Sequence, residues 1–405
     1  MNRFMGIPCD NLKTNTIHMK LALQLAYKNL VGAGLRSWLN IGILAFTFIV
    51  IIFFNAYLDG WNLQAQRESI KWEYGHGQLR HQDYDPLDPF SINEAHGKLN
   101  TSQSENLTAV LIQQASLYPE GRMVSVLMKG IDSAQKILEL PTEAFAKSDA
   151  NIPALIGKRM ASSNKLEVGD QLLLRWRDKN GTFDAAEITI ADIFETDVTS
   201  VDAGQIWIPI ERLWNMTGLK GEATYFIAGE NYSHSPVDAW YFKSQAELLK
   251  QLQEIIEMKS ASSSILYFLL LGIALLAIFD TQVLSIFRRQ KEIGTYIALG
   301  MTRWQVVQLF TVEGSMYSIL ASIVGTIIGV PIFWYFSTFG IGMPDYVTQQ
   351  DMGVTIAQRI YPAFTIGLIM GTIALVVLSA TIVSFIPSRN IAKMDPVDAL
   401  KGKVQ

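Results

Sequence analysis

Apolar residues gather in four windows of the chain, and each window holds roughly 20 mostly apolar residues. That is about the number of residues a helix needs to cross ~30 Å of hydrocarbon. Lipid offers no hydrogen-bonding partners to backbone amides, so each window should form a complete helix. The predicted membrane spans are residues 39–58, 264–287, 309–336 and 363–386.

A long, more polar segment, residues 59–263, separates the first two windows and carries strand signals. Asn180-Gly181 lies between two extended runs, which is a strong short-range hairpin signal. Ile188 and Ile190 alternate with polar neighbours, as is typical of a half-buried strand. Ile206, Ile208 and Ile210 alternate with Trp207 and Pro209, which likewise predicts a half-buried strand. About 200 residues suffice for one or two small α/β subdomains.

The two ends of this segment have helical patterns instead. Residues 246–258 place leucines and isoleucines on one stripe, and residues 59–74 prolong the first apolar window. We therefore expect the first two membrane helices to continue outward as a stalk; the alternative is two surface helices that pack on the domain. The predicted fold class is a membrane protein with four transmembrane α-helices and a large extracytoplasmic α+β domain between the first and second helix.

The distribution of charge predicts the orientation. The N-terminal segment 1–38, the connection 288–308 and the tail 387–405 together carry thirteen basic residues against four acidic ones. Because cytoplasmic loops hold the excess of Lys and Arg, both termini and the connection should be cytoplasmic. Residues 59–263 and the short loop 337–362 should face outward.

Candidate catalytic chemistry is sparse. His76 and His81 lie near three aspartates, but a solvated loop accounts for them, so no metal site is predicted. Cys9 is the only cysteine, which excludes an intrachain disulfide within this sequence. The sequence contains no GxxxxGK[ST], so it carries no P-loop of its own, and we expect a non-catalytic chain.

Two acidic residues, Asp280 and Glu313, lie within the apolar windows, where ionisable groups are functional hypotheses by default. Pairing with Arg288 or Arg303 would make them anchors of the helix ends instead. Ion-coupled transport is not favoured, because the windows hold no further ionisable groups at mid-depth.

Two small-xxx-small pairs predict close helix packing. They are Gly325 with Gly329, and Gly367 with Gly371. We expect them to pack the third helix against the fourth; dimerisation is the alternative.

The segment "RRQKEIGTYIALGMTRWQVVQLFTVEG", residues 288–314, places charged residues between two apolar windows. Ile293, Ile297 and residues 299–301 recur at helical spacing, while Gly294 and Gly300 permit sharp turns. From composition alone, the segment is either a short amphipathic docking helix or a passive loop held against anionic lipid.

This segment resembles a motif of the FtsX/MacB-like permeases of ABC transporters. The residues that match are Arg289, Lys291, Glu292, Ile293, Gly294, Ala298, Leu299, Gly300, Phe310, Glu313 and Gly314. The tail resembles the closing motif of the same family through Pro387, Ala392, Asp395, Pro396, Ala399 and Leu400. Within the family, "MKGID" and "ALIGKRMASSNKLEVGDQLLL" are most similar to the lipoprotein-releasing, Lol-type permeases.

The resemblance implies a type VII ABC permease subunit in a bacterial cytoplasmic membrane. It would work as a dimer with itself or a paralogue, on a dimer of separate ATPase subunits that bind ATP and Mg²⁺. It implies that residues 288–308 hold the coupling helix. The coupling residues would be Arg288, Arg289, Lys291, Glu292, Ile293, Gly294, Ala298, Leu299 and Gly300.

The function implied is mechanotransmission. ATP-driven closure would move the external domain and extract lipoproteins or similar amphiphiles, with a periplasmic carrier as a further partner and no nucleic acid involved. Two alternatives stay open: an FtsX-type module that activates an external hydrolase, and MacB-type efflux of drugs or peptides.

Overall fold

The described residues divide into two compact units. The computed structural model describes residues 35–99, 106–233, 236–343 and 357–394. The helical unit comprises Met1–Asp59, Met258–Gly340 and Tyr361–Gln405, and the sheet unit comprises Gly60–Glu257 and Ile341–Ile360. The family resemblance also predicts a cytoplasmic amphipathic helix over residues 1–38; its residues 1–34, and the tail matches from Asp395 to Leu400, lie outside the described residues.

Four long helices provide the apolar surface of the chain. They are α2 (Leu35–Ser69), α7 (Gln245–Arg288), α9 (Arg303–Phe339) and α11 (Ile366–Ser388). Among the described residues these four are long and apolar enough to cross a membrane. Large apolar side chains such as Phe268, Ile327 and Ile366 are exposed on them, as lipid-facing side chains would be. The four predicted spans are therefore present as helices.

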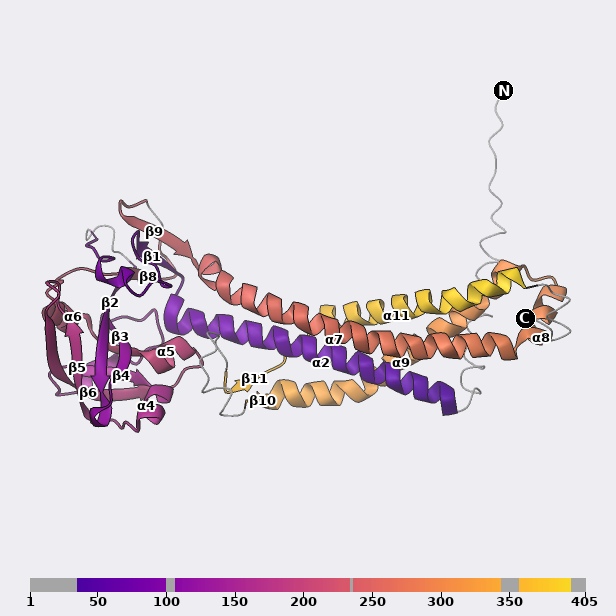
Figure 1. Ribbon diagram of the computed structural model, residues 1–405, viewed down its shortest axis with the longest axis horizontal. Helices are drawn as coiled ribbons and strands as arrows, with labels where there is room; N and C mark the ends of the chain where they lie inside the picture. Colours follow the sequence, from indigo (N-terminus) through magenta and orange to yellow (C-terminus); the bar gives the residue numbers. More distant parts are fainter. Residues whose placement is uncertain (1–34, 100–105, 234–235, 344–356, 395–405) are drawn as a thin grey trace, which may run out of the picture. The chain divides into compact units, whose positions relative to one another are not determined.

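The helical unit also has its own buried core, to which all four long helices contribute (Figure 1). Phe48 and Ile52 of α2 meet Ala321 of α9 and Val376 of α11 in this core. Helix α2 continues past the unit to Ser69, and α7 runs without a break through the serine-rich residues 260–264.

The described residues of the sheet unit form a nine-stranded sheet in the order β3-β7-β4-β6-β5-β2-β8-β1-β9. The strands are β1 (Gly77–His81), β2 (Leu107–Tyr118), β3 (Val124–Ile131), β4 (Pro153–Gly157), β5 (Gln171–Arg177), β6 (Phe183–Phe194), β7 (Gln205–Pro209), β8 (Tyr225–Ala228) and β9 (Trp240–Ser244). An additional β2–β3 pairing closes six of them into a ring. Closure leaves none of those six strands with a free edge.

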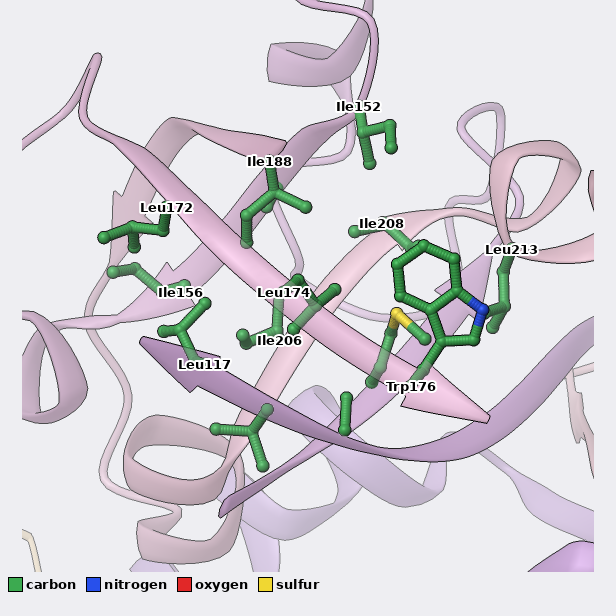
Figure 2. Close-up of a cluster of buried hydrophobic side chains, with 14 of the residues drawn as sticks. Leu117, Ile152, Ile156, Leu172, Leu174, Trp176, Ile188, Ile206, Ile208 and Leu213 are labelled. Carbon is green, nitrogen blue, oxygen red and sulfur yellow. The ribbon is translucent and has the colours of Figure 1, made fainter. Parts of the chain in front are cut away.

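The ring encloses the main core of the sheet unit. Figure 2 shows Leu117, Leu174, Trp176, Ile206 and Ile208 pointing toward one another between the strands. The indole of Trp176 donates to the carbonyl of Met216 at 3.1 Å, so its polar edge is satisfied. The hairpin predicted at Asn180-Gly181 is confirmed: β5 pairs with β6 in antiparallel register.

Four short helices and a π-helical turn pack against the ring. The helices are α3 (Glu143–Lys147), α4 (Lys158–Asn164), α5 (Thr199–Gly204) and α6 (Ile210–Thr217), and the π-helical turn is Ile70–Tyr74. Of these, α4 and α6 add side chains to the main core, and α3, α5 and the π-helical turn contribute to a second cluster. In this second apolar cluster Trp72 stacks on Phe194 with ring centroids 5.5 Å apart. Asp202 of α5 is buried and holds the Nε of Arg159 at 3.2 Å.

The prediction of a half-buried strand at 206–210 is wrong. All residues of β7 are buried, Trp207 completely, and Ile210 begins α6. The physical reason is that β7 lies between β3 and β4, with the ring core on one face and the second cluster on the other.

The predicted loop 337–362 contains a small ladder. β10 (Ile341–Gly342) pairs with β11 (Arg359–Ile360), and both belong to the sheet unit. The backbone N–H of Gln358 donates to the carboxylate of Asp197 at 3.1 Å, and its side-chain amide donates to Glu195 at 3.1 Å. Residues 344–356 of the loop lie outside the described residues.

Candidate functional site

The segment between α7 and α9 folds into a short helix, α8 (Gln290–Ala298). α7 ends at Arg288, and Arg289 leaves helical geometry at φ −106° and ψ 21°. The hydrogen bonds continue across this break, because the N–H of Arg289 donates to Ser285 and the N–H of Ile293 donates to Arg289, both at 3.0 Å. These two hydrogen bonds bridge the break between α7 and α8.

The end of α8 is a Schellman motif. Met301 donates its N–H to Tyr296 at 3.1 Å, and Gly300 donates to Ile297 at 3.0 Å. The turn requires φ +101° at Gly300, a conformation that side-chain-bearing residues rarely adopt. Gly300 therefore makes the turn that its sequence position predicted, whereas Gly294 lies inside α8 and makes none.

α9 begins directly after this motif with a capping box. The N–H of Thr302 donates to the side chain of Gln305 at 2.8 Å, and the N–H of Gln305 donates to the Thr302 hydroxyl at 3.3 Å. Helix α9 thus starts at Arg303, six residues before the predicted apolar span. The two caps follow one another immediately, so the backbone between α8 and α9 has little freedom to bend.

The inner face of α8 is anchored by a buried cluster. Ile293 is fully buried against Val306 and Phe310 of α9. Ile286 of α7 and Ile391, which follows α11, complete this cluster. The side chains of the α8 inner face are therefore held by three other elements of the helical unit.

Arg289 is held inside the helical unit by two carboxylates. Its Nη1 lies 2.8 and 2.9 Å from the two carboxylate oxygens of Glu313, and its Nε lies 2.6 Å from Glu292. The guanidinium also lies over the ring of Phe310, 4.9 Å from the centroid. Only 18% of the Arg289 side chain and 10% of the Glu313 side chain are exposed.

One prediction needs correction here. Glu313 does pair with a basic residue, but its partner is Arg289 rather than Arg288 or Arg303; the Arg303 guanidinium donates to the carbonyl of Ala392 at 3.1 Å. The charge of Arg289 is neutralised within the chain by Glu292 and Glu313. The two intramembrane acids also differ, because Glu313 is buried whereas Asp280 is exposed on α7.

The outer face of α8 presents the remaining predicted residues. Arg288, Lys291, Glu292, Ala298, Leu299 and Gly300 are exposed. Leu299, directly after the last residue of α8, is 79% exposed. Arg288 and Lys291 have no ion pair among the described residues, and two such basic residues beside a protruding leucine are chemically suited to a protein surface with an apolar pocket and acidic rim.

Sequence reasoning missed a three-helix contact next to Glu313. A Cβ added at Gly314 of α9 would lie 2.3 Å from the hydroxyl oxygen of Ser384 of α11 and 2.6 Å from the amide nitrogen of Gln282 of α7. Gln282 and Ser384 are both buried. The available signal was a glycine directly after an acid inside an apolar window, which marks close approach of neighbouring helices.

We expected the glycine pairs to pack α9 against α11, but they do not. A Cβ at Gly325 would meet Phe48 of α2 at 2.7 Å, and one at Gly329 would come within 3.4 Å of Ile49 of the same helix. Gly367 and Gly371 have nothing within 4 Å of an added Cβ. Both line an apolar cleft of about 310 Å³ with Tyr267, Phe268 and Leu375 among its walls.

The histidines and acids of the described residues form no group of three or more that could hold a metal ion. His81 Nδ1 lies 3.5 Å from Asp83, and its ring packs edge-on against Trp240 with centroids 5.3 Å apart. Burial lowers the pKa of His81, and the nearby carboxylate of Asp83 opposes this shift.

Comparison with known proteins points to one family. Residues 264–396 match the family described as FtsX-like permease C-terminal. The macrolide export ATP-binding/permease protein MacB of Marinobacter nauticus is 26% identical over 162 residues, 38% of this chain and 22% of that protein. The probable syringafactin export ATP-binding/permease protein SyfD of Pseudomonas syringae pv. tomato is 25% identical over 156 residues, 38% of this chain and 21% of that protein.

This chain spans about a fifth of the length of these relatives. A likeness to the crystal structure of the extracellular domain of the ABC-type transporter YknZ, from Gram-positive bacteria, covers 38% of this chain and 83% of that one, at 13% identity and a TM-score of 0.23. The family match and the MacB relative agree with the FtsX/MacB part of the resemblance.

Proposed function

We propose that the chain is the permease subunit of an ABC transporter, a proposal that starts from the match of residues 264–396 to the family described as FtsX-like permease C-terminal. Its α8 docks on a separate ATPase, which binds ATP and Mg²⁺. Closure of the ATPase moves α8 and α9, and the movement reaches the sheet unit on the outer side of the bacterial cytoplasmic membrane. A second permease, this chain or a paralogue, completes the complex.

The observation that carries the proposal is the construction of α8. Its inner face is locked by the Ile293 cluster and by the Arg289–Glu313 pair, while its outer face exposes Leu299 and Lys291. Back-to-back caps at Gly300 and Thr302 join it to α9. A docking element needs an exposed apolar anchor, and a transmitting element needs a stiff joint; α8 has both.

The cargo we propose is a lipoprotein or a similar amphiphile, extracted from the outer leaflet. The apolar cleft of the helical unit supports this class, since its lining is largely hydrocarbon and its two exposed glycines leave room for an acyl chain. Two other functions use the same coupling. The named exports of the relatives favour MacB-type efflux, and an FtsX-type module would activate an external hydrolase without moving cargo.

One pair of variants tests coupling. Leu299→Asp places a charge where an apolar anchor should be buried against the ATPase, and Val168→Asp is a matched control on an exposed apolar residue of the sheet unit. Each tagged chain is purified from its host membrane, and the co-purifying ATPase and its ATP hydrolysis are measured. We expect Leu299→Asp to lose at least about tenfold in both, a typical loss for a buried interface anchor. Undiminished ATP hydrolysis with Leu299→Asp would show that this segment does not dock on the ATPase.

The same strains test cargo. With Leu299→Asp as the only copy, lipid-anchored proteins should accumulate in the cytoplasmic membrane, and with Val168→Asp they should not. Normal lipoprotein sorting combined with lost ATP hydrolysis would reject extraction but keep coupling. Altered drug tolerance in that case would indicate efflux, and altered wall turnover would indicate activation of a hydrolase.

A further inference from the structure

The sheet unit contains a polar pocket that the proposed function does not use. Its volume is about 280 Å³, near the lower end of the range for small-ligand sites. β1, β3, β8 and the first turns of α7 supply its buried residues, and the π-helical turn, the loop after β1, β9 and α7 supply the rest. All of its lining residues belong to the sheet unit.

Two buried cations line the pocket. Lys129 is 3% exposed and Arg80 is 8% exposed. The Lys129 ammonium donates to the hydroxyl of Tyr225 at 3.4 Å and lies 5.0 Å from the ring centroid of Trp207. The Arg80 Nε donates to the side-chain oxygen of Gln78 at 2.9 Å, and its guanidinium lies over the Tyr84 ring. Every one of these partners is neutral.

No carboxylate of the described residues lies within 4.0 Å of either cation, although four acids line the pocket. Three of the acids are already engaged. Glu247 accepts from the N–H and hydroxyl of Ser244 at 2.8 and 2.9 Å, Glu254 pairs with Lys250, and Asp85 accepts from the N–H of Leu87 at 2.9 Å. Glu73, the fourth, is half-buried and lies 3.5 Å from the hydroxyl of Ser200.

Buried charges in proteins are normally paired, because an unpaired charge in a low-dielectric interior is costly. Here two cations line one pocket, and no carboxylate of the described residues accepts a hydrogen bond from their remaining N–H groups. Guanidinium and ammonium groups, together with phenol donors, are the groups that recognise phosphate and carboxylate oxygens. Burial holds the pKa of Tyr84 at about 12, so its phenol keeps its proton at neutral pH.

We propose that this pocket binds the oxyanion head of a small organic ligand, a phosphate or carboxylate, between Arg80 and Lys129. The anion neutralises both cations at the buried wall, and the tyrosines contact the remainder of the ligand. Tyr84 and Tyr225 stack with ring centroids 6.0 Å apart, which gives that wall a flat aromatic face. The site is independent of α8 coupling, so either proposal can fail while the other stands.

The test uses the full-length chain in nanodiscs, at constant ionic strength with chloride as the reference anion. Thermal unfolding is followed while inorganic phosphate, acetate or glycerol 3-phosphate is titrated, since a ligand that binds the folded state raises the unfolding temperature. A second arm compares phosphatidylcholine nanodiscs with discs that contain phosphatidylglycerol. The first arm reports a soluble anion, and the second reports a lipid head group.

The variants are Lys129→Met and Arg80→Gln, with Lys250→Met as the matched control at the exposed rim. We expect saturable stabilisation by glycerol 3-phosphate or by anionic lipid. Each of the first two variants should weaken it by about tenfold to a hundredfold, as the loss of a charged hydrogen bond does, and Lys250→Met should not. Equal affinity in all variants, or no saturable response to any of these anions, would overturn the proposal.

Discussion

Arg289 of the helical unit and Lys129 of the sheet unit are both cations with most of their surface removed from solvent, yet their surroundings are opposite. Arg289 contacts two carboxylates within 2.9 Å. Only the residues next to it in the sequence are therefore exposed for contact with a partner. Lys129 contacts a phenol and two aromatic faces. The first cation is part of the framework, and the second has capacity left for a ligand.

The difference shows that a conspicuous basic residue is a poor guide to a binding site until its partners are known. "RRQKE" draws attention because of its charge, but Arg289 is neutralised by carboxylates within the chain. "MKGID", with the single basic residue Lys129, looks ordinary, yet Lys129 is buried without a carboxylate within 4.0 Å among the described residues. Three measurements of stability test whether the two cations differ in this way.

The largest effect should come from Glu313→Ala, which strands the Arg289 guanidinium without its buried carboxylate. Breaking a buried pair from one side typically costs about 3 kcal/mol of unfolding free energy, and the low exposure of both side chains places this pair in that class. Thermal unfolding of the purified chain in detergent measures it. The double variant Arg289→Met with Glu313→Leu should recover most of the loss, and a single variant as stable as the parent would refute the framework role.

Lys129→Met should act in the other direction and stabilise the unliganded protein by about 2 kcal/mol, because burial disfavours the charged form. Burial lowers the Lys129 pKa from 10.5 to about 8, with Glu73 opposing and Arg80 adding to the shift. Tyr225 also faces the ammonium.

Between pH 8 and 10.5 the unfolded chain therefore holds more protons on this group than the folded chain does. The free energy of unfolding of the parent should rise with pH across that window, relative to Lys129→Met, whereas oxyanion affinity should fall as pH passes 8. Parallel pH curves for the two proteins would contradict an uncompensated buried charge at this position.

The smallest effect belongs to Glu292→Ala. Its carboxylate contacts Arg289 at 2.6 Å, but its side chain is 55% exposed, so water and salt screen the pair. We expect a loss below about 1 kcal/mol that shrinks further in high salt. A loss as large as that of Glu313→Ala would mean that the two carboxylates act as one buried unit.

The parts of the fold that sequence could predict are those with local causes. Each membrane span follows from the length of an apolar window, and the β5–β6 hairpin follows from Asn180-Gly181 between extended runs. The ring could not be predicted from the sequence, because pairing of β2 with β5 and of β3 with β7 joins residues far apart in the chain. Without the ring, the burial of both faces of β7 could not be foreseen.

The candidate site likewise has features that follow from local sequence and features that depend on contacts with other helices. A short helix with a turn at Gly300 could be predicted from spacing and glycine chemistry, and α8 is present with that turn. The direction of a side chain depends on neighbours from other helices. Glu313 of α9 draws Arg289 inward, and α2 rather than α11 lies against Gly325. Neither relation leaves a mark in the local sequence.

The closed ring of the sheet unit also has a consequence for how the chain reaches its native state. Its strands pair in an order unlike their order along the chain, so most contacts form only after long loops have closed, which slows folding. β2 cannot complete its pairs until β5 has been synthesised, and β3 must wait for β7. Until then, strand edges that the finished ring hides are open to other chains. During biogenesis the sheet unit therefore passes through a stage in which these edges are exposed.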